Sequence, residues 1–245
     1  MDKPVALITG ASRGIGRAVA IQLARDGYHV VINYHTRQES AEAVLDLIQR
    51  EGGAAVVRGF DVSKQPEVEV AVQELTSKVG PIQILVNNAA IGSLHLLMRM
   101  PDEAWHEVID TDLNGVYYCT KAVVRTWAGK RSPGRRIITM TSNAGEAGYA
   151  GTSHYCAAKT GVIAFSKALA RELAPSGVTV NVVAPGFIAT EGSLSVIPVE
   201  KWLGKIPLGR IGEPDEVAYV VSFLVSERAG YITGQIIRVN GGLIM

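Results

Sequence analysis

The chain has 245 residues, 47% of them hydrophobic, and a formal net charge of +1. A charge so near neutral, with both signs interspersed, gives no electrostatic argument for a nucleic-acid or membrane partner. A chain of this length and hydrophobicity can bury a large core without disulfides or structural metals, so we predict that residues 1–245 form a single domain.

Short apolar runs alternate with longer amphipathic segments along the chain. The runs are nearly continuous in Val, Ile and Leu, which is typical of parallel strands covered on both faces. They predict strands at 5–9, 29–33, 54–59, 82–86, 136–140, 179–184 and 236–239. The amphipathic segments predict helices at about 15–26, 39–51, 65–78, 102–128, 153–174 and 213–226. This alternation predicts an α/β fold, a Rossmann-like doubly wound parallel sheet of about seven strands with helices on both faces.

One segment, residues 187–210, carries few periodic signals. A long irregular insertion near the carboxyl ends of the strands is where a substrate lid would lie, and we expect this segment to be one.

The chain shows no signs of secretion, of a membrane span or of a metal site. No apolar stretch approaches the roughly 20 residues of a span, and Val5-Ala6-Leu7-Ile8 is too short for the apolar core of a signal peptide. The two cysteines, Cys119 and Cys156, predict buried thiols in a reducing compartment. The five histidines do not pair with Cys or acidic residues at metal-ligand spacing. We therefore expect a cytoplasmic protein without a bound metal.

The first predicted strand ends in a glycine-rich turn, Thr9-Gly10-Ala11-Ser12-Arg13-Gly14-Ile15-Gly16. Glycines permit a tight turn and a close approach of the backbone to a pyrophosphate, which the N-terminus of the following helix stabilises. The spacing G-x-x-x-G-x-G departs from the common G-x-G-x-x-G, and a turn without a ligand is the alternative. Its position after the first strand favours a dinucleotide site.

The second predicted strand indicates which dinucleotide is bound. It ends at Asn33-Tyr34-His35-Thr36-Arg37, with no carboxylate where NAD sites carry one for the adenosine ribose. Arg13 and Arg37 could instead pair with a 2′-phosphate, although simple solvation at the surface is the alternative for both. The pattern favours NADP(H). Asp61-Val62 would suit the adenine edge, and Asn87-Asn88-Ala89 would line the same crevice.

Tyr155 and Lys159 are four residues apart and would share one face of a helix. A nearby ammonium favours the phenolate, so we expect Lys159 to lower the pKa of Tyr155 and make it a proton donor near neutral pH. Taken alone, the pair also fits an ordinary helix with a half-buried Tyr and a solvated Lys.

Several motifs occur together and in order. They are Thr9-Gly10-x-x-x-Gly14-x-Gly16, Asn87-Asn88-Ala89, Asn114, Ser142, Tyr155-x-x-x-Lys159 and Asn181-x-x-x-Pro185-Gly186. With them the chain resembles, essentially end to end, the short-chain dehydrogenase/reductase family. Within that family it is similar to the 3-oxoacyl-(acyl-carrier-protein) reductase group.

The resemblance implies roles for four residues. Tyr155 would protonate the carbonyl oxygen as hydride arrives from the nicotinamide, and Ser142 would hydrogen-bond the same oxygen. Lys159 would hold the nicotinamide ribose. Asn114, inside the long helical segment, would hold a water that relays protons to Lys159, with a local distortion of the helix. An ordinary solvent-facing Asn is the alternative for Asn114.

The resemblance also implies a set of cofactor contacts. Pro185, Gly186 and Ile188 would flank the nicotinamide, and Thr190 would reach its carboxamide. The full expected set is Gly10, Ser12, Arg13, Gly14, Ile15, Gly16, Asn33, Arg37, Asp61, Val62, Asn88, Ala89, Tyr155, Lys159, Pro185, Gly186, Ile188 and Thr190.

For function, the resemblance implies NADPH-dependent reduction of a 3-oxoacyl thioester linked to acyl carrier protein, as in fatty acid biosynthesis, by a homotetramer. Apolar surface on the predicted helices 102–128 and 153–174 could pair across a two-fold axis. A dehydrogenase of small alcohols, sugars or cyclic ketones with the same chemistry is the alternative. A dinucleotide-binding sensor without catalysis is a further one.

Three features depart from the reductase group. Ala90 stands where the group usually has Gly, and it would disfavour a positive φ. Ser176 stands where many members that dock a carrier protein have a basic residue. The loop 129–136 is longer and more basic than usual, and its cations could form a docking patch or simply be solvated: Lys130, Arg131, Arg135 and Arg136.

Two further side chains near the expected site have structural interpretations. His154 should project about 100° away from Tyr155 on the helix, which makes it pocket wall or surface and not a base. Trp202, in the expected lid, is predicted to pack and to influence the choice of substrate.

Overall fold

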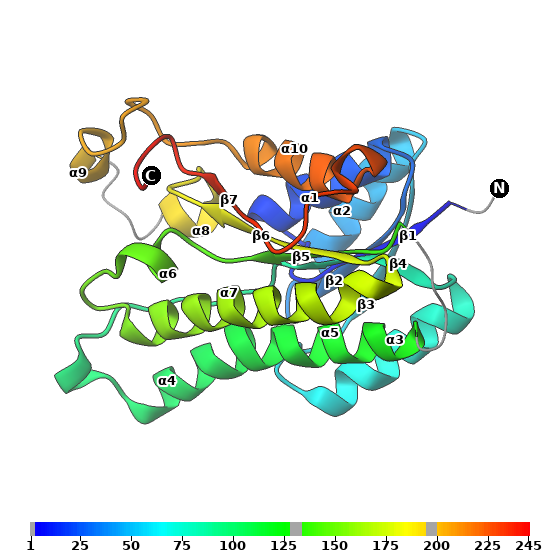
Figure 1. The fold of residues 1–245 in the computed structure, drawn as a ribbon, viewed down its shortest axis with the longest axis horizontal. Coiled ribbons are helices and arrows are strands. Elements are labelled where there is room, and N and C mark those ends of the chain that lie inside the picture. The colour runs from blue at the N-terminus through cyan, green and yellow to red at the C-terminus, as the bar shows by residue number, and fades with distance from the viewer. Residues whose placement is uncertain (1–2, 128–133, 195–199) are drawn as a thin grey trace.

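The computed structural model describes residues 3–127, 134–194 and 200–245. At its centre is one parallel sheet with the strand order β3-β2-β1-β4-β5-β6-β7 (Figure 1). Its strands are β1 (Val5–Ile8), β2 (His29–Tyr34), β3 (Ala54–Gly59), β4 (Ile82–Asn87), β5 (Arg136–Met140), β6 (Thr179–Pro185) and β7 (Ile236–Val239). Each predicted strand is confirmed to within one residue at its ends.

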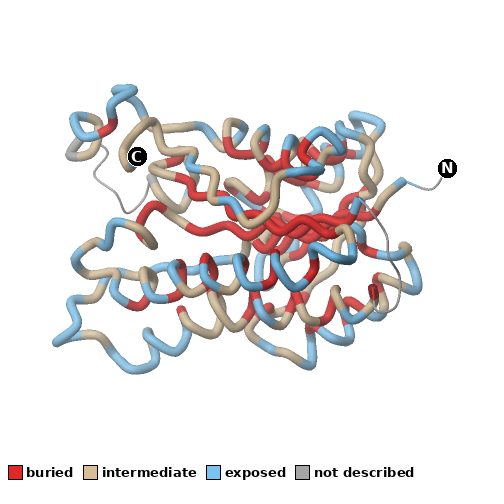
Figure 2. The backbone as a smooth tube through the Cα atoms, in the orientation of Figure 1, coloured by how far each residue is buried: buried red, intermediate tan, exposed pale blue. Residues whose placement is uncertain are grey.

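Two helical layers cover the sheet because successive strand residues point to opposite faces. In β1, Ile8 packs with one layer and Leu7 with the other, and both are fully buried. The first layer contains α1 (Gly14–Arg25), α2 (Gln38–Arg50) and α10 (Pro214–Val225). The second contains α3 (Gln65–Lys78), α5 (Gly115–Thr126) and α7 (Ser153–Leu173). Figure 2 shows the buried residues concentrated in the strands between these layers. The Rossmann-like fold with helices on both faces is confirmed.

The predicted helix at 102–128 is interrupted. The segment consists of α4 (Asp102–Ile109), a π-helical turn (Asp110–Asn114) and α5, which ends at Thr126. A π turn widens the helix by one residue and is common at functional sites. The local distortion expected near Asn114 is therefore present, and it makes one continuous helix the wrong description.

The segment expected to form a lid contains two short helices, α8 (Glu191–Leu194) and α9 (Glu200–Leu203). A parallel bridge between Ile188 and Gly212 ties its two ends together. Trp202 packs against the rings of Phe187 and Tyr149, at centroid distances of 4.4 Å and 5.4 Å. The packing role predicted for Trp202 is confirmed, whereas its role in substrate choice stays a prediction.

The basic loop differs from its prediction where it is described. Lys130 and Arg131 lie outside the described residues. Arg135 and Arg136 are only 8% and 5% exposed, and burial lowers the pKa of both guanidinium groups. Arg135 stacks 5.1 Å over the ring of Trp127 and donates a hydrogen bond to its carbonyl oxygen. The proposal of a docking patch is therefore wrong for Arg135 and Arg136, which are covered by the protein itself.

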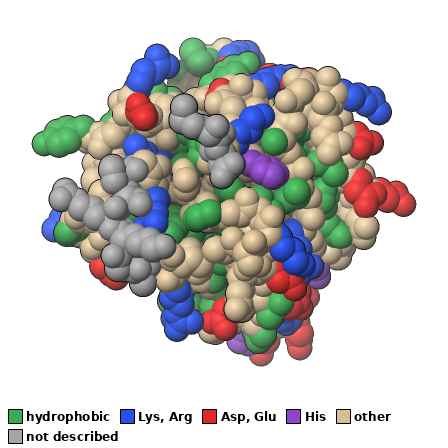
Figure 3. All heavy atoms as spheres, turned by 90° about the vertical axis from the view of Figure 1, so that its right-hand side faces the viewer, with side chains coloured by type: hydrophobic (Ala, Val, Ile, Leu, Met, Phe, Trp, Pro, Cys, Tyr) green, Lys and Arg blue, Asp and Glu red, His purple; other side chains and the backbone are tan. Residues whose placement is uncertain are grey.

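The remaining described elements are short. They are α6 (Ala144–Ala147) and the 3₁₀ turns Leu97–Arg99, Ala174–Ser176 and Glu227–Ala229. Cys119 is buried and Cys156 only half-buried, so the expectation of buried thiols holds for Cys119 alone. Across the described residues, no helix is long and apolar enough to cross a membrane. On the side of the molecule near the N-terminus, Lys and Arg mix with Asp and Glu (Figure 3).

Candidate active site

The site lies where the direction of the strand order reverses. β1 is followed by β2 on one side of the sheet, and its other neighbour, β4, leads to β5 on the opposite side. Such a reversal leaves a crevice at the carboxyl ends of the strands, where ligands bind in open α/β sheets. A cleft of about 390 Å³ opens at this edge, with the glycine-rich turn in its wall.

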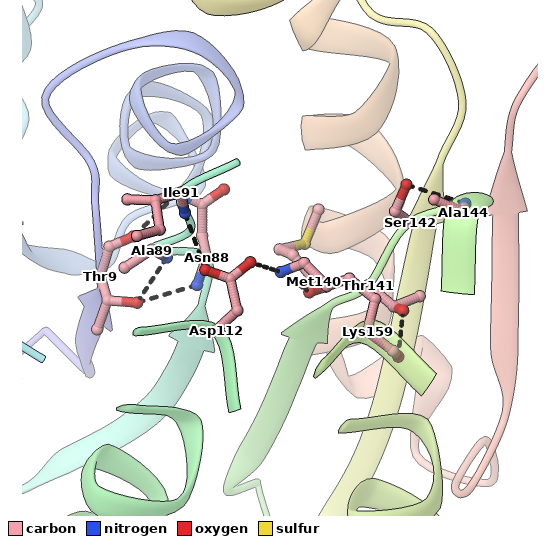
Figure 4. A network of polar contacts seen from close by, with 10 residues as sticks. All are labelled: Thr9, Asn88, Ala89, Ile91, Asp112, Met140, Thr141, Ser142, Ala144 and Lys159. Atoms are coloured by element: carbon pink, nitrogen blue, oxygen red, sulfur yellow. Dashed lines mark hydrogen bonds and ion pairs between the residues drawn. The ribbon is translucent and has the colours of Figure 1, made fainter. Parts of the chain in front are cut away.

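Hydrogen bonds from the two residues that follow β4 hold the glycine-rich turn in place (Figure 4). The hydroxyl of Thr9 accepts bonds from the backbone N–H groups of Asn88 and Ala89, at 2.9 Å and 3.0 Å. The side-chain amide of Asn88 donates to the carbonyl oxygens of Thr9 and Gly10, at 2.9 Å and 3.0 Å. Both bonds from the Asn88 amide nitrogen therefore lie within the protein, where they fix the shape of the turn.

Two glycines are needed where this turn is tightest. Gly10 has a φ of +62°, and a Cβ there would lie 2.8 Å from the Cα of Ala89. A Cβ on Gly16 would lie 2.4 Å from both the Asn88 amide nitrogen and the Gly10 carbonyl oxygen. Backbone therefore packs against backbone where α1 begins, and the residues of its first turn, Gly14, Ile15 and Gly16, line the cleft. This arrangement fits a dinucleotide pyrophosphate.

Asn33 supports the turn from the end of β2. Its side-chain oxygen accepts a 3.0 Å bond from the N–H of Gly10, and its amide nitrogen donates to the Phe60 carbonyl oxygen at 3.1 Å. The residue lines the cleft but is only 2% exposed. We conclude that Asn33 shapes the wall of the cleft and has its polar groups engaged inside the protein.

The charges at the adenosine end of the cleft match the sequence analysis. Arg13 and Arg37 both line the cleft, and within the described part of the chain no carboxylate pairs with either guanidinium. Asp61 also lines it, and its carboxylate accepts bonds from the backbone N–H and hydroxyl of Ser63. His35 lies 3.8 Å from the same carboxylate.

The structure places most of the expected cofactor set in the cleft wall. The residues that line it are Gly10, Ser12, Arg13, Gly14, Ile15, Gly16, Asn33, Arg37, Asp61, Val62, Asn88, Ala89 and Thr190. The cleft is also lined by residues that were not predicted from the sequence: Tyr34, His35, Thr36, Phe60, Ala90, Ile91, Thr111, Glu191 and Gly192. Several of these residues directly follow a predicted strand, and that position could have identified them as part of the cleft. Ala90 causes no strain, because among the described residues only glycines have a positive φ.

The other expected contacts lie outside this wall: Tyr155, Lys159, Pro185, Gly186 and Ile188. Pro185 ends β6, and its carbonyl oxygen accepts a 3.1 Å bond from the N–H of Asn143. A Cβ on Gly186 would lie 2.7 Å from the Cα of Asn240, so the two backbones touch here. This contact joins the end of β6 to the segment that follows β7.

Ser142, Tyr155 and Lys159 come together beyond the end of β5. Ser142 follows this strand by two residues, and its hydroxyl accepts a 3.1 Å bond from the N–H of Ala144, where α6 begins. α6 packs closely on α7, since a Cβ on Gly145 would lie 3.0 Å from backbone of Lys159. The Ser142 hydroxyl donates a 3.1 Å bond to the side-chain oxygen of Asn143, and Ser142 also acts to lower the pKa of Tyr155. The Lys159 ammonium lies 5.4 Å from the centre of the tyrosine ring.

Lys159 is held on its other side by a buried carboxylate. The side chains of Lys159 and Asp112 are 2% and 0% exposed, and their charged atoms lie 3.1 Å apart. The second carboxylate oxygen of Asp112 accepts a 2.8 Å bond from the N–H of Ile91, a residue of the cleft wall. Figure 4 shows Asp112 between the β4 end of the site and Lys159. Asp112 therefore links the dinucleotide cleft to the Tyr155–Lys159 pair.

Asp112, which was not predicted from the sequence, is the residue of this helical segment that pairs with Lys159. The side chain of Asn114 donates a 2.8 Å bond to Asp110 on its own π turn, and it is Asp112 that contacts Lys159. The role expected for Asn114, holding a water that relays protons to Lys159, stays a prediction.

The pKa of Tyr155 differs from the prediction. Burial raises the pKa of Tyr155. The Lys159 ammonium and Ser142 oppose this rise, while Asp112 adds to it. Burial would lower the pKa of Lys159, but attraction to Asp112 and Tyr155 raises it overall. Lys159 does act in the expected direction on Tyr155, yet the expected net lowering is wrong because burial and Asp112 outweigh it.

His154 is more buried than expected. It is 0% exposed, its Nε2 lies 3.1 Å from the Ser93 hydroxyl, and its ring meets that of His95 edge-on at 6.2 Å. Burial lowers its pKa, and His95 lowers it further. His154 is thus buried between α7 and the loop after β4, so the surface interpretation is wrong, while its place in a pocket wall stays a prediction.

The arrangement has a clear chemical capacity. A phenol that keeps its proton at neutral pH can donate it to a carbonyl oxygen, and a hydroxyl beside it can stabilise the charge that develops on that oxygen. A neighbouring cleft with a backbone cradle for a pyrophosphate can place a dinucleotide against the same carbonyl.

Comparisons with known proteins agree with this chemistry. Residues 10–244 match the family model described as enoyl-(acyl carrier protein) reductase. The chain is 46% identical to a 3-oxoacyl-(acyl-carrier-protein) reductase of Staphylococcus epidermidis, over 98% of both chains. It is 47% identical to one of Synechocystis, over 98% of this chain and 97% of the relative, and 43% identical to one of Haemophilus influenzae over both full lengths. The chain therefore belongs to the short-chain dehydrogenase/reductase family, which implies a nicotinamide dinucleotide cofactor.

Proposed function

We propose that this protein reduces a 3-oxoacyl thioester to the 3-hydroxyacyl thioester with NADPH. The observation that carries the proposal is the cluster of Ser142, Tyr155 and Lys159 next to a cleft shaped for a dinucleotide. The substrate class is supported by relatives at 43–47% identity whose names state 3-oxoacyl-(acyl-carrier-protein) reduction.

A bound nicotinamide supplies the hydride that reduces the substrate's carbonyl carbon. Tyr155 donates its phenolic proton to the carbonyl oxygen, so that the ketone becomes an alcohol. Ser142 donates a hydrogen bond to the same oxygen and stabilises its developing negative charge. Lys159 contributes a buried positive charge close to Tyr155 and a donor for the ribose hydroxyls.

The choice of NADPH over NADH is supported by the charges at the adenosine end. Arg13 and Arg37 supply two guanidinium groups at the cleft wall, and residues 35–37 after β2 include no carboxylate. A guanidinium binds a phosphate with charge-assisted, often bidentate hydrogen bonds, whereas it gains little from a ribose hydroxyl.

The carrier-linked form of the substrate and a homotetrameric assembly are further parts of the proposal. Tyr117 of α5 is 41% exposed and meets the ring of Phe165 of α7 edge-on, so apolar surface spans these two helices. Such a surface could pair across a two-fold axis.

Light scattering coupled to size exclusion tests the assembly. A homotetramer would give a mass near four times 26.1 kDa. The cytoplasmic location stays a prediction.

A panel of ketones tests the substrate class. Purified protein with NADPH is given acetoacetyl-CoA, cyclohexanone and a simple ketose, and the loss of NADPH absorbance is followed. We expect turnover of the thioester to be at least about a hundredfold faster than that of the others, as expected when remote binding energy is used in the transition state. Faster turnover of the cyclic ketone or the sugar would replace the proposal with the alternative dehydrogenase. Binding of NADPH without any turnover would support a sensor.

A further inference from the structure

The reaction as proposed leaves the buried carboxylate of Asp112 without a task. Asp112 is 0% exposed, and a carboxylate with no access to water is costly unless it is paired. Its partner is Lys159, whose side chain is also buried. A cation and an anion in contact largely cancel each other's field at a third group, and here the third group is Tyr155.

The position of Asp112 is fixed by contacts unrelated to Lys159. The π turn carries its backbone, and the N–H of Ile91 holds one carboxylate oxygen at 2.8 Å. The other oxygen lies 3.1 Å from the Lys159 ammonium, and the Met140 carbonyl oxygen accepts a 3.3 Å bond from the same ammonium. The ammonium is therefore held between β5 and the π turn, at a set distance from the tyrosine ring.

We propose that Asp112 is a positioning residue that holds Lys159 and cancels part of its charge, so that Tyr155 keeps its proton into the alkaline range. This inference rests on the proposed function, in which Tyr155 is the proton donor. Because ketone reduction requires the protonated phenol, the carboxylate widens the pH range in which the reducing form exists. The upward effect of Asp112 on the pKa of Tyr155 agrees with this geometry.

The other charged and titratable groups around Tyr155 are few. On α7 they are His154, Cys156 and Lys159, and from the loop after β4 comes His95. Burial and His95 keep the pKa of His154 below its ordinary value, so this ring is neutral in the alkaline range. From the β5 end comes the hydroxyl of Ser142. Asp112 is thus the carboxylate that acts on Tyr155 in this set.

Asp112→Asn removes the charge and keeps the shape. The amide oxygen can still accept the bond from the N–H of Ile91, while Lys159 loses its negative partner. A like charge near the phenolate is then gone and the cation is unopposed, so the pKa of Tyr155 should fall. Asp110→Asn is the matched control, because Asp110 lies on the same π turn but bonds Asn114 and not Lys159.

The experiment measures the pH dependence of kcat/KM for acetoacetyl-CoA reduction in the parent and both variants. We expect the alkaline pKa of the profile to fall by about one unit or more in Asp112→Asn, within the range for removal of a close charge. The alkaline pKa of the Asp110→Asn profile should equal that of the parent. Superimposable profiles for the parent and Asp112→Asn, or an equal shift in Asp110→Asn, would overturn the inference.

A second readout does not depend on activity. Tyrosinate absorbance of the cofactor-free protein is titrated, and the curve of a matching Tyr155→Phe variant is subtracted to isolate one of the eight tyrosines. The pKa of Tyr155 should be lower in Asp112→Asn than in the parent, and equal values would refute the inference. If the parent does not reduce the thioester, the proposed function fails while this titration still decides the role of Asp112. Should Asp112→Asn not fold, Asp112→Ser is expected to show the same fall.

Discussion

Thr9→Val is a sharp test of how the cofactor turn is held. Thr9 is 1% exposed, and its hydroxyl accepts the backbone N–H groups of Asn88 and Ala89. Valine has nearly the same shape but no acceptor, so both N–H groups lose their partner. The Val86 carbonyl oxygen, to which the hydroxyl donates at 3.4 Å, keeps the N–H of Thr9 at 3.0 Å and loses little.

The expected cost follows from these two amides. Each lost bond at a half-buried site costs about 1 kcal/mol, so the free energy of unfolding should fall by about 2 kcal/mol. For a chain of this size that corresponds to a drop in Tm of about 4–8 °C. Because Asn88 and Ala89 line the cleft, NADPH binding should weaken as well.

The assay is urea unfolding at a fixed protein concentration, together with NADPH titration by fluorescence. Thr76→Val is the control, since the Thr76 hydroxyl donates to the Val72 carbonyl oxygen within α3 and accepts no amide. We expect a change below about 0.5 kcal/mol for the control, as is usual away from special features. A Thr9→Val protein as stable as the control variant would refute this account of the turn.

Two further predictions concern the ends of the site. Arg37→Ala should raise the KM for NADPH about tenfold or more, because one charge-assisted contact is worth about 1.5–3 kcal/mol. The KM for NADH should stay nearly unchanged. Equal effects on the two KM values would contradict a contact between Arg37 and the 2′-phosphate. Trp202→Ala removes ring contacts with Phe187 and Tyr149, each worth about 0.5–1.5 kcal/mol, and should raise the KM for the thioester severalfold without changing NADPH affinity. An unchanged KM would show that Trp202 does not shape the substrate site.

The sheet was predictable because its strands repeat a strong local signal. Helices cover both faces of β1, β4 and β5, so nearly every residue of these strands is buried and most of them are hydrophobic. The glycine-rich turn was predictable for a similar reason, since Gly10 and Gly16 are required by backbone contacts that only glycine permits.

Asp112 escaped the sequence analysis although the periodicity contained a sign of it. Val108, Asp112, Val116 and Cys119 follow helical spacing, and all four are buried. A carboxylate on such a stripe indicates a buried partner. Only Asn114 was named on this segment, by resemblance, and its side chain bonds Asp110 whereas Asp112 pairs with Lys159.

The burial of Arg135 and Arg136 could not be read from the basic run at 130–136 either. Composition alone describes this run as a solvated loop, whereas Arg135 stacks on the ring of Trp127 and Arg136 is a buried residue of β5. The pKa of Tyr155 is a similar case. Whether it is raised or lowered depends on burial and on Asp112, and both are properties of the fold.

The most direct test of the central claim is the rate of hydride transfer in Tyr155→Phe. The variant lacks only the phenolic hydroxyl, and a single turnover of acetoacetyl-CoA with bound NADPH is followed at neutral pH. The account predicts a rate lower than that of the parent by about 10²–10⁴-fold, the usual contribution of a proton donor, with NADPH affinity nearly unchanged. A variant that reduces the ketone as fast as the parent would contradict the assignment of Tyr155 as the acid.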